Sequence, residues 1–444
     1  MKPIKVGLLG LGTVGSGVFK VLERNQQEIM RRAGRGIEIA AVSRRDVGAA
    51  KLVVGNAARV LADPFEIVRD PEIDIVIELI GGTGIARELV MEAIAAGKHV
   101  VTANKALLAV HGTEIFAAAH EHGVMIGFEA AVAGGIPIIK ALREGLTANR
   151  IEWIAGIING TTNFILSEMR DKGLDFDVVL KEAQALGYAE ADPTFDIEGV
   201  DAAHKATIMS AIAFGIPVQF DKAYTEGITK LAAQDIRYAE QLGYRIKLLG
   251  ITKRTESGVE LRVHPCLVPA KRLIANVEGA MNAVLVQADA VGTTLYYGKG
   301  AGSEPTASAV IADLVDVTRL HTADAAHRVP HLAFQPGTME QAAADSPVLP
   351  MDQVVTSYYL RLRVADKAGV LAQVTGIVAG AGISIDAVLQ READEVGGEG
   401  ATSTDLIMLT HDTREGTMNE ALAEMQALPT VLAPIVRIRK EELA

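Results

Sequence analysis

The chain has 444 residues, 49% of them hydrophobic but only 4% aromatic, and its 43 basic and 55 acidic side chains leave a formal net charge of -12. This length and composition exclude a disordered or fibrous chain and predict two or three domains with aliphatic α/β cores. The negative charge and the lack of a long Lys/Arg cluster argue against nucleic acid or an anionic membrane as a partner. Because no leader pattern or membrane-spanning stretch is visible, we expect a cytoplasmic protein.

The single cysteine, Cys266, lies within residues 262–267, which predict a strand. One cysteine cannot form an intramolecular disulfide, and this suits a reducing compartment. We expect a buried structural thiol rather than a nucleophile.

A glycine-rich turn follows the first predicted strand, residues 4–9, and precedes a predicted helix over residues 16–27. The turn reads Gly10-Leu11-Gly12-Thr13-Val14-Gly15, the GxGxxG spacing of dinucleotide-binding folds of the Rossmann type. In that motif the first glycine turns the chain, the second lets the backbone approach a pyrophosphate, and the third packs the helix on the strand. The setting therefore predicts NAD(P) binding rather than a glycine turn without a ligand.

The second predicted strand, residues 37–42, ends in Ser43-Arg44-Arg45, and no acid precedes Asp46. NAD-specific folds usually place an acid here against the ribose 2'-hydroxyl, whereas arginine and serine suit a 2'-phosphate. The pattern favours NADP and leaves NAD open.

Strands and helices continue to alternate, with strands expected over 73–79, 100–103 and 124–128 and helices over 86–96 and 113–122. This order is typical of a doubly wound parallel sheet, in which ligands bind beyond the carboxyl ends of the strands. Those ends carry Gly81, Thr102 and Lys105. We expect Lys105 to point towards the nicotinamide end of the crevice, although a solvated loop lysine is the plainer interpretation.

Carboxylates and an amine are concentrated between Gly187 and Lys205, namely Glu190, Asp192, Asp196, Asp201 and Lys205. An apolar helix is predicted after Gly199, and on it Asp201 and Lys205, four residues apart, share one face. Such a pair is normally a surface salt bridge of small value. The apolar surroundings instead indicate a buried polar pocket for a small zwitterion and a proton transfer.

This segment resembles the signature of the homoserine dehydrogenase family. The resemblance extends to the glycine turn and to further motifs, namely Thr102-Ala103-Asn104-Lys105, residues 129–137, Asn159-Gly160-Thr161-Thr162-Asn163 and residues 298–302. It implies reversible hydride transfer between L-homoserine with NAD(P)+ and L-aspartate 4-semialdehyde with NAD(P)H, the branch step towards threonine, isoleucine and methionine.

The resemblance also implies roles for the two lysines. Lys205 would be the general acid in aldehyde reduction and the base in the reverse direction. Lys105 would hold the reacting oxygen or the cofactor and stabilise developing negative charge.

The substrate ammonium would be bound by Glu190 and Asp201, with support from Asp196. Thr161 and Tyr188 would add hydrogen bonds at the amino-acid end. For Thr161, a helix N-cap is a competing interpretation.

The resemblance further implies a monovalent cation, usually sodium, held by backbone oxygens of Glu129, Val132, Gly134 and Ile136, and we expect it to be structural. A hinge between domains is the ordinary explanation for this glycine-rich stretch. No zinc pattern is visible, since His327 and His331, although at helical spacing, are separated by Pro330.

From Ser357 onwards the predicted elements follow a βαββαβ order. This resembles an ACT domain, a module that pairs with copies of itself and binds amino acids, so threonine is the expected effector. Ala368 stands where that family often has proline and Ser384 where it often has asparagine, and a purely oligomerising role therefore stays open.

We expect a Rossmann domain over 1–130, completed by a helix over 303–320 that lets Gly302 touch the cofactor. An α+β domain for substrate binding and dimerisation is expected over 131–302. A linker over 328–353 and an ACT domain over 354–444 follow. We expect a homo-oligomer, either a dimer or a tetramer.

Three other functions share some of these sequence features. Aspartate-semialdehyde dehydrogenase needs a catalytic cysteine, for which Cys266 is a poor candidate. A phosphoglycerate-type dehydrogenase would carry its nucleotide fold in mid-chain. A non-catalytic nucleotide- and amino-acid-binding regulatory protein is the alternative from another class, and the presence of both Lys105 and Lys205 argues against it.

Overall fold

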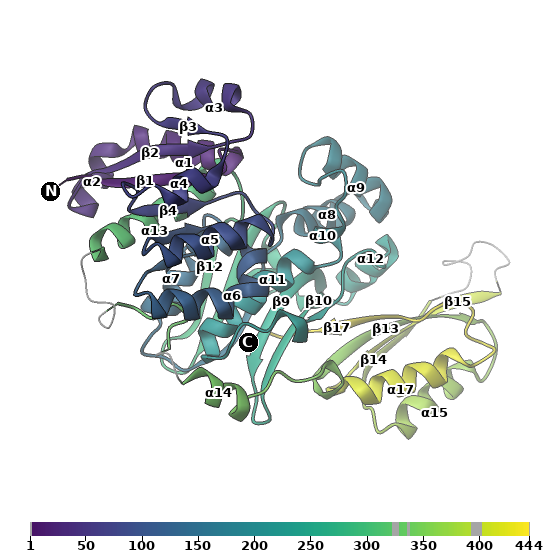
Figure 1. Ribbon diagram of the computed structural model, residues 1–444. Coiled ribbons are helices and arrows are strands. Elements are labelled where there is room, and N and C mark those ends of the chain that lie inside the picture. Colours follow the sequence, from purple (N-terminus) through teal and green to yellow (C-terminus); the bar gives the residue numbers. More distant parts are fainter. Residues whose placement is uncertain (1, 322–327, 335–337, 392–401, 444) are drawn as a thin grey trace.

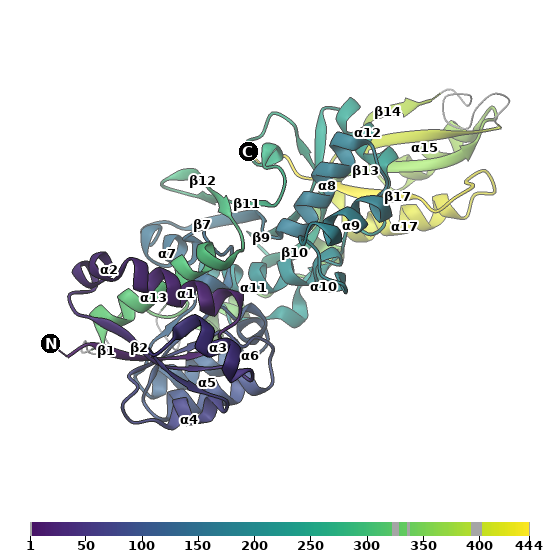
Figure 2. The ribbon, with the colours of Figure 1, turned by 90° about the horizontal axis from the view of Figure 1, so that it is seen from above.

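The computed structural model describes residues 2–321, 328–334, 338–391 and 402–443. The N-terminal part and the C-terminal part lie at opposite ends of the molecule, and the sheet of the central part lies between them (Figures 1 and 2). None of the helices in these ranges has the length and apolar composition that a bilayer span requires.

The N-terminal part is a parallel sheet of six strands with the order β3-β2-β1-β4-β5-β6. The strands are β1 (Ile4–Leu9), β2 (Ile37–Ser43), β3 (Arg59–Leu61), β4 (Ile75–Glu78), β5 (His99–Thr102) and β6 (Ile126–Gly127). The helices are α1 (Thr13–Arg24), α2 (Gln26–Ala33), α3 (Val47–Val54), α4 (Pro64–Arg69), α5 (Ile85–Ala95) and α6 (Lys105–Glu121). The central strands are buried runs of aliphatic residues, as a sheet covered on both faces requires, so the predicted doubly wound class is confirmed.

Two of the expected helix starts were wrong. Helix α1 begins at Thr13, three residues early, because the last glycine of the turn, Gly15, lies inside the helix. Helix α6 begins at Lys105 rather than 113, because the Asn104 side chain caps it by accepting a 3.0 Å hydrogen bond from the Leu107 amide. Lys105 is therefore the first residue of a helix and not a loop residue.

A distant helix, α13 (Ser303–Leu320), returns to this domain and packs on α1. The Ser303 hydroxyl donates to the Thr13 carbonyl at 2.8 Å, and Arg24 pairs with Glu304 at 3.0 Å. A Cβ on Gly17 would come within 2.6 Å of the Ser303 oxygen, so the close approach of the two helices requires a glycine there.

The central part is built on strands β7 (Ile151–Ile157), β9 (Tyr244–Arg254), β10 (Val259–Pro269), β11 (Met281–Ala288) and β12 (Gly292–Lys299), with the short β8 (Tyr224–Thr225) beside β10. Its helices are η1 (Glu129–Ala131), α7 (Ile138–Lys140), η2 (Ala141–Gly145), α8 (Gly160–Lys172), α9 (Phe176–Ala185), α10 (Thr194–Ile197), α11 (Val200–Phe214), η3 (Phe220–Lys222), α12 (Ala233–Gln241) and η4 (Ile274–Asn276). Helix α11 packs against β9 and β10 on one side and against α6 on the other, so it lies between the central sheet and the N-terminal domain.

The C-terminal part has the predicted βαββαβ order, with elements β13 (Val355–Ala365), α15 (Val370–Gly380), β14 (Ile385–Gln390), β15 (Ser403–Thr410), β16 (Thr413–Arg414), α17 (Glu415–Gln426) and β17 (Val436–Lys440). The last strand begins only at Val436, and Val431 forms an isolated bridge to Val364. Strand β17 pairs antiparallel with β13 and, at Cys266 and Arg439, parallel with β10. One continuous sheet therefore joins the central and C-terminal parts (Figure 1).

The expected linker is partly ordered. It contains α14 (Met339–Asp345) and the short helix η6 (Met351–Gln353). Its Pro347 carbonyl and Leu349 amide both bond to Val259 at 2.8 Å, which attaches the segment to the start of β10. Residues 335–337 of this segment lie outside the described residues.

Candidate active site

Helix α11 carries the predicted Asp201 and Lys205, and both side chains are buried. The Lys205 ammonium donates to Asp201 Oδ2 at 2.8 Å and to the Ile158 carbonyl at 2.7 Å. The helix starts at Gly199, whose φ of +82° an L side chain would adopt only with strain. The pair is therefore an interior one, as the apolar helix predicts, and not a surface salt bridge.

Lys105 reaches the same carboxylate from the N-terminal domain. Its ammonium lies 2.7 Å from Asp201 Oδ1, while Lys205 uses Oδ2. Lys105 remains half-exposed, so it faces the space beside the pair rather than the core. Two amines from two domains thus meet on one carboxylate.

The surroundings shift the pKa values of Asp201, Lys205 and Lys105 in different ways. Burial opposes ionisation of Asp201, but the charges of Lys205 and Lys105 outweigh it and hold the pKa of the carboxyl well below its usual range. Burial lowers the pKa of Lys205 despite the attraction of Asp201. Burial would also lower the pKa of Lys105, but the charge and hydrogen bond of Asp201 prevail and the pKa is raised. Of the two lysines, Lys205 therefore gives up its proton more readily.

Thr161 and Tyr188 lie next to this centre. The Thr161 hydroxyl donates to the Tyr188 carbonyl at 2.7 Å and lies 3.3 Å from Asp196 Oδ2. The N-cap interpretation of Thr161 was wrong, because Asn159 caps α8 and accepts from the Thr162 amide at 2.8 Å. The Thr161 hydroxyl is thereby available to the pocket.

Glu190 and Asp192 occupy the exposed rim. The negative charge of Glu190 contributes to the raised pKa of Lys105, which places the two side chains in electrostatic range of each other. Asp192 accepts from the Thr194 amide at 3.1 Å, just before α10, whose N-cap is Pro193.

Two polar residues that the sequence analysis did not select belong to the site. Asn159 donates to both Asp196 and Asp201. Glu78, fully buried at the end of β4, accepts from the amides of Ile80 and Gly81 and from the Thr102 hydroxyl at 2.8 to 2.9 Å. In the sequence, Glu78 is a polar residue at the last position of an otherwise apolar strand, and Asn159 stands just after such a strand. These positions could have indicated both residues.

The Glu78 network continues into α6. Thr102 accepts from the Asn104 amide at 3.0 Å, and the Asn104 side chain donates to the Gly82 carbonyl at 2.7 Å. The Thr102 hydroxyl thus has a structural partner on either side. These contacts fix the strand ends from which Lys105 starts.

The glycine turn has the geometry of a pyrophosphate cradle. A Cβ on Gly10 would lie 2.7 Å from the Leu79 carbonyl oxygen, and one on Gly15 would lie 2.2 Å from the Gly10 carbonyl oxygen. A Cβ on Gly12 would meet no atom within 4 Å, so the space over this glycine is open. The Ser43 carbonyl holds the turn through the amides of Gly10 and Leu11. Gly302, with φ +129°, opens α13 beside it.

The end of β2 carries no free acid. Arg44 folds over the turn and donates to the Leu11 carbonyl at 3.0 Å, whereas Arg45 is exposed. The first acid, Asp46, caps α3 by accepting from the Ala49 amide at 2.9 Å. Its carboxylate is therefore committed to the helix.

The glycine-rich stretch after β6 folds against the Gly298 to Gly302 loop. A Cβ on Gly134 would lie 2.4 Å from the Gly300 oxygen, and Ala133 has a φ of +55°, which is rare for an L residue. The Glu129 carboxylate is turned away and accepts from the amides of Ile139 and Lys140 at 2.8 Å. Burial and the neighbouring Asp313 raise the pKa of Glu129 to about 7.

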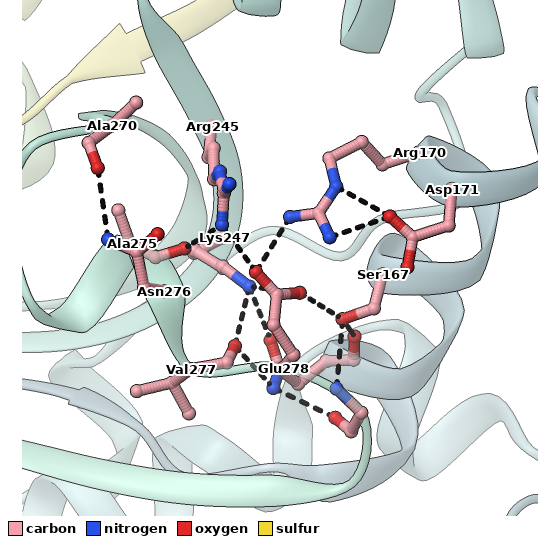
Figure 3. A network of polar contacts seen from close by, with 12 residues as sticks. Ser167, Arg170, Asp171, Arg245, Lys247, Ala270, Ala275, Asn276, Val277 and Glu278 are labelled. Carbon is pink, nitrogen blue, oxygen red and sulfur yellow. Dashed lines mark hydrogen bonds and ion pairs between the residues drawn. The ribbon is translucent and has the colours of Figure 1, made fainter.

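A network around Glu278 supports the other end of α8 (Figure 3). Glu278 accepts from Arg245 at 2.6 Å, from Arg170 at 2.7 Å and from Ser167 at 3.0 Å. The buried Lys247 donates to the Val277 carbonyl at 2.6 Å, and burial lowers the pKa of this lysine to about 8. These contacts fasten α8 to the central sheet, and the opposite end of α8 carries Asn159 and Thr161.

One cluster in the described residues has the side chains of a metal site, namely His264, Cys266 and Glu441. The guanidinium of Arg262 already occupies it, with Nη1 at 2.8 Å from His264 and at 2.5 Å from Glu441. A cation is therefore present in the cluster without a metal. Cys266 is buried and has the raised pKa of an unreactive thiol. His327 of the predicted histidine pair lies outside the described residues.

Three family profiles match the chain: "Homoserine dehydrogenase, NAD binding domain" over residues 10–129, "Homoserine dehydrogenase" over 137–315 and "ACT domain" over 358–430. A homoserine dehydrogenase of Pseudomonas aeruginosa is 62% identical over 443 residues, and one of Neisseria gonorrhoeae is 58% identical over 443 residues, each match covering 100% of both chains.

Solved structures agree with these matches. The crystal structure of a homoserine dehydrogenase from Thiobacillus denitrificans has a TM-score of 0.94 and 66% identity and covers 100% of this chain and 99% of that one. A hyperthermophilic archaeal homoserine dehydrogenase in complex with NADPH has a TM-score of 0.62 and 26% identity and covers 73% of this chain and 99% of the other. The matches to the two bacterial relatives and to the Thiobacillus denitrificans structure cover this chain along its whole length, and the chain belongs to the homoserine dehydrogenase family.

Proposed function

We propose that Lys205, Lys105 and Asp201 form the reaction centre for the NAD(P)-dependent oxidoreductase activity of this family, the interconversion of L-homoserine and L-aspartate 4-semialdehyde. The observation that carries the proposal is the buried Asp201 carboxylate that both lysines share, at 2.7 and 2.8 Å. Such a carboxylate fixes the positions of both amines and keeps them apart from each other.

The bound nicotinamide cofactor would supply or accept the hydride. Lys205 donates its proton to the aldehyde oxygen in reduction and removes it from the homoserine hydroxyl in oxidation, since burial lowers the pKa of this lysine towards the working range of a general acid and base. Lys105, half-exposed and with a raised pKa, stays charged and stabilises the oxygen as negative charge develops on it.

The substrate ammonium is bound on the side of Asp196 and Glu190. Asp196 is half-buried beside the Thr161 hydroxyl, and Glu190 is exposed at the rim. Thr161 and the Tyr188 carbonyl add hydrogen-bonding groups there. Asp201 is also proposed to contact the ammonium, as the resemblance implies. Its oxygens accept from Lys105, Lys205 and Asn159, so it orients the lysines as well.

NADP is the proposed cofactor. Residues 10–15 form the pyrophosphate cradle, with Gly12 facing open space, and Gly81, Thr102 and Gly302 line the same edge. Ser43, Arg44 and Arg45 stand where a 2'-phosphate would lie, and the nearest acid, Asp46, is already used as a helix cap. An unengaged acid, which NAD recognition needs, is absent from this strand end.

A monovalent cation, proposed to be sodium, would be held by the carbonyl oxygens of Glu129, Val132, Gly134 and Ile136. The strained loop offers neutral, hard carbonyl oxygens as ligands. Because the Glu129 side chain is engaged elsewhere, the ligands carry no negative charge, which fits a monovalent ion. Its proposed role is to stiffen the connection between residues 1–130 and 131–302, which we propose as the nucleotide and substrate domains.

The ACT unit, proposed over residues 354–444, is consistent with regulation. Threonine is the proposed effector, and a homo-oligomer, dimer or tetramer, is the proposed assembly.

The test is to replace Asp201 by Asn and to measure homoserine-dependent reduction of NADP+ and NAD+. Without the carboxylate charge, the buried Lys205 and the half-exposed Lys105 both lose their ion pair, and we expect kcat/KM to fall by about a hundredfold or more. The matched control is Asp192→Asn on the exposed rim, which keeps the oxygen that accepts from the Thr194 amide. If Asp201→Asn retains the activity of this control, the proposed centre is wrong.

A further inference from the structure

Asn159 sits between the end of β7 and the start of α8, and 5% of its surface is exposed. The residue before it, Ile158, accepts the Lys205 ammonium on its carbonyl oxygen. This short segment therefore contacts the reaction centre through both its backbone and its side chain.

The hydrogen bonds of the Asn159 side chain fix its orientation. Its Oδ1 accepts from the Thr162 amide at 2.8 Å and from the Thr162 hydroxyl at 2.9 Å. The NH2 group must then point the other way, where it donates to Asp196 Oδ1 at 2.7 Å and to Asp201 Oδ2 at 2.8 Å. Both donors of the amide are used, and each contacts a different carboxylate.

These two carboxylates repel each other, and they are compensated unequally. Asp201 is paired with Lys105 and Lys205. Asp196 instead accepts a hydrogen bond from a neutral group, the Asn159 amide, and its Oδ2 lies 3.3 Å from the Thr161 hydroxyl, which donates to the Tyr188 carbonyl. Burial and the charge of Asp201 raise the pKa of Asp196, while the hydrogen bond from Asn159 opposes that rise. The amide thus favours the charged form of the carboxylate that would meet the substrate ammonium.

We infer that Asn159 is a positioning residue of this active site: its NH2 group bridges Asp196 and Asp201 and holds both in the orientation that binds substrate and aligns the lysines. The inference rests on the roles proposed above for these two aspartates. An amide is the neutral side chain of this length that offers two donors and one acceptor at once. An aspartate at this position would replace the NH2 group by a negatively charged oxygen facing the two carboxylates. A serine would be too short to reach both partners.

The test separates bridging from helix capping, because Asp and Ser are both good N-caps. In Asn159→Asp, an oxygen still accepts from the Thr162 amide, but no NH2 group faces the carboxylates. We expect kcat/KM for homoserine to fall by about 10- to 100-fold at neutral pH, the size of a lost hydrogen bond to a charged group. Helix capping alone predicts no change.

The pH profile gives a second readout. Charged groups face this position from three helices: Asp196 on α10, Asp201 and Lys205 on α11 and Lys105 on α6. Among two other carboxylates, the new carboxyl group ionises only at raised pH, and while protonated it can still donate to one of them. The ratio of variant to wild-type kcat/KM should therefore fall as the pH rises.

Two further variants complete the experiment. Asn159→Ser keeps a capping oxygen and removes the bridge without adding charge, so it should lose activity without the pH-dependent ratio. Asn149→Asp adds the same charge at a site where the oxygen accepts from the Val291 amide, and it should behave as the wild type. If Asn159→Asp does not fold, as judged by thermal unfolding and NADPH binding, the serine variant decides.

The inference is overturned if both Asn159 variants stay within about twofold of wild-type kcat/KM at every pH. Asp196→Asn and Asp201→Asn are measured in parallel. If these two variants are active, the proposed roles of the aspartates fail, whatever Asn159 does. If they are inactive and the Asn159 variants are active, only the bridging role fails.

Discussion

Lys205→Met is the substitution that tests the proton-transfer step most directly. Methionine has a similar length and fills the buried site, but it has no proton to give. Asp201 keeps its 2.7 Å contact with Lys105 and its 2.8 Å hydrogen bond from Asn159, so the carboxylate stays compensated and the fold should persist. The loss should therefore fall on the chemical step and not on the architecture.

A positioned general acid or base is worth about 100- to 10,000-fold in rate. We expect kcat of Lys205→Met to fall within that range, while the homoserine KM changes by no more than about threefold, since the groups proposed for the ammonium are untouched. Steady-state kinetics in the direction of homoserine oxidation measure both values, and NADPH binding reports on folding.

The pH profile adds a check with a definite sign. The base form of Lys205 is needed for oxidation, and burial lowers its pKa, so wild-type kcat should rise with pH and level off below 10.5, the ordinary value for lysine. This rise should be absent in Lys205→Met. Lys105→Met is the matched comparison, and it should impair KM and kcat together because this lysine is proposed to hold the oxygen. A Lys205→Met enzyme with kcat within about tenfold of wild type would refute the reasoning.

Two further predictions concern the cofactor and the framework. Arg44→Asp should move the ratio of kcat/KM for NADP+ over NAD+ towards NAD+ by about tenfold or more, because it replaces a phosphate-binding cation by an acid, and an unchanged ratio would exclude this strand end as the 2'-phosphate site. Burial lowers the pKa of Lys247 from the ordinary 10.5 to about 8, which corresponds to a destabilisation of the folded state by about 3 kcal/mol when this lysine is charged. That cost is fully present below pH 8 and is relieved as the pH rises towards 10.5, because only the unfolded chain still binds the proton there. The free energy of unfolding of wild type relative to Lys247→Met, from urea titrations, should thus increase across this range, and a flat difference would contradict the prediction.

The nucleotide-binding half was predictable because its signals are local. A glycine turn between a strand and a helix, and the period of the buried strands, depend on residues close together in the chain. The Asp201–Lys205 pair was also visible, since i,i+4 spacing on an apolar helix requires the two groups to share a buried face. The sequence did not show that both lysines share the Asp201 carboxylate, because Lys105 reaches it from another domain.

Asn159 shows a second limit. The sequence suggested a helix cap at Thr161, whereas the Oδ1 of Asn159 caps α8. The donors on the other side of the same amide meet Asp196 and Asp201, some forty residues further on. Only the packing of α10 and α11 against the start of α8 gives these donors their partners. The polar position after an apolar strand could therefore indicate Asn159 as a site residue, but not which carboxylates it bridges.

The junction with the C-terminal unit is the least local feature, and it affects how regulation can be studied. Arg439 on β17 lies buried beside β10 and pairs with Glu226 at 2.8 Å and with Glu415 through its Nε at 2.9 Å. Deleting residues 354–444 would leave Glu226 without this partner and uncover the edge of β10. A truncated chain would therefore change the central sheet as well as the proposed effector response, and substitutions confined to the ACT unit separate the two effects where a deletion does not.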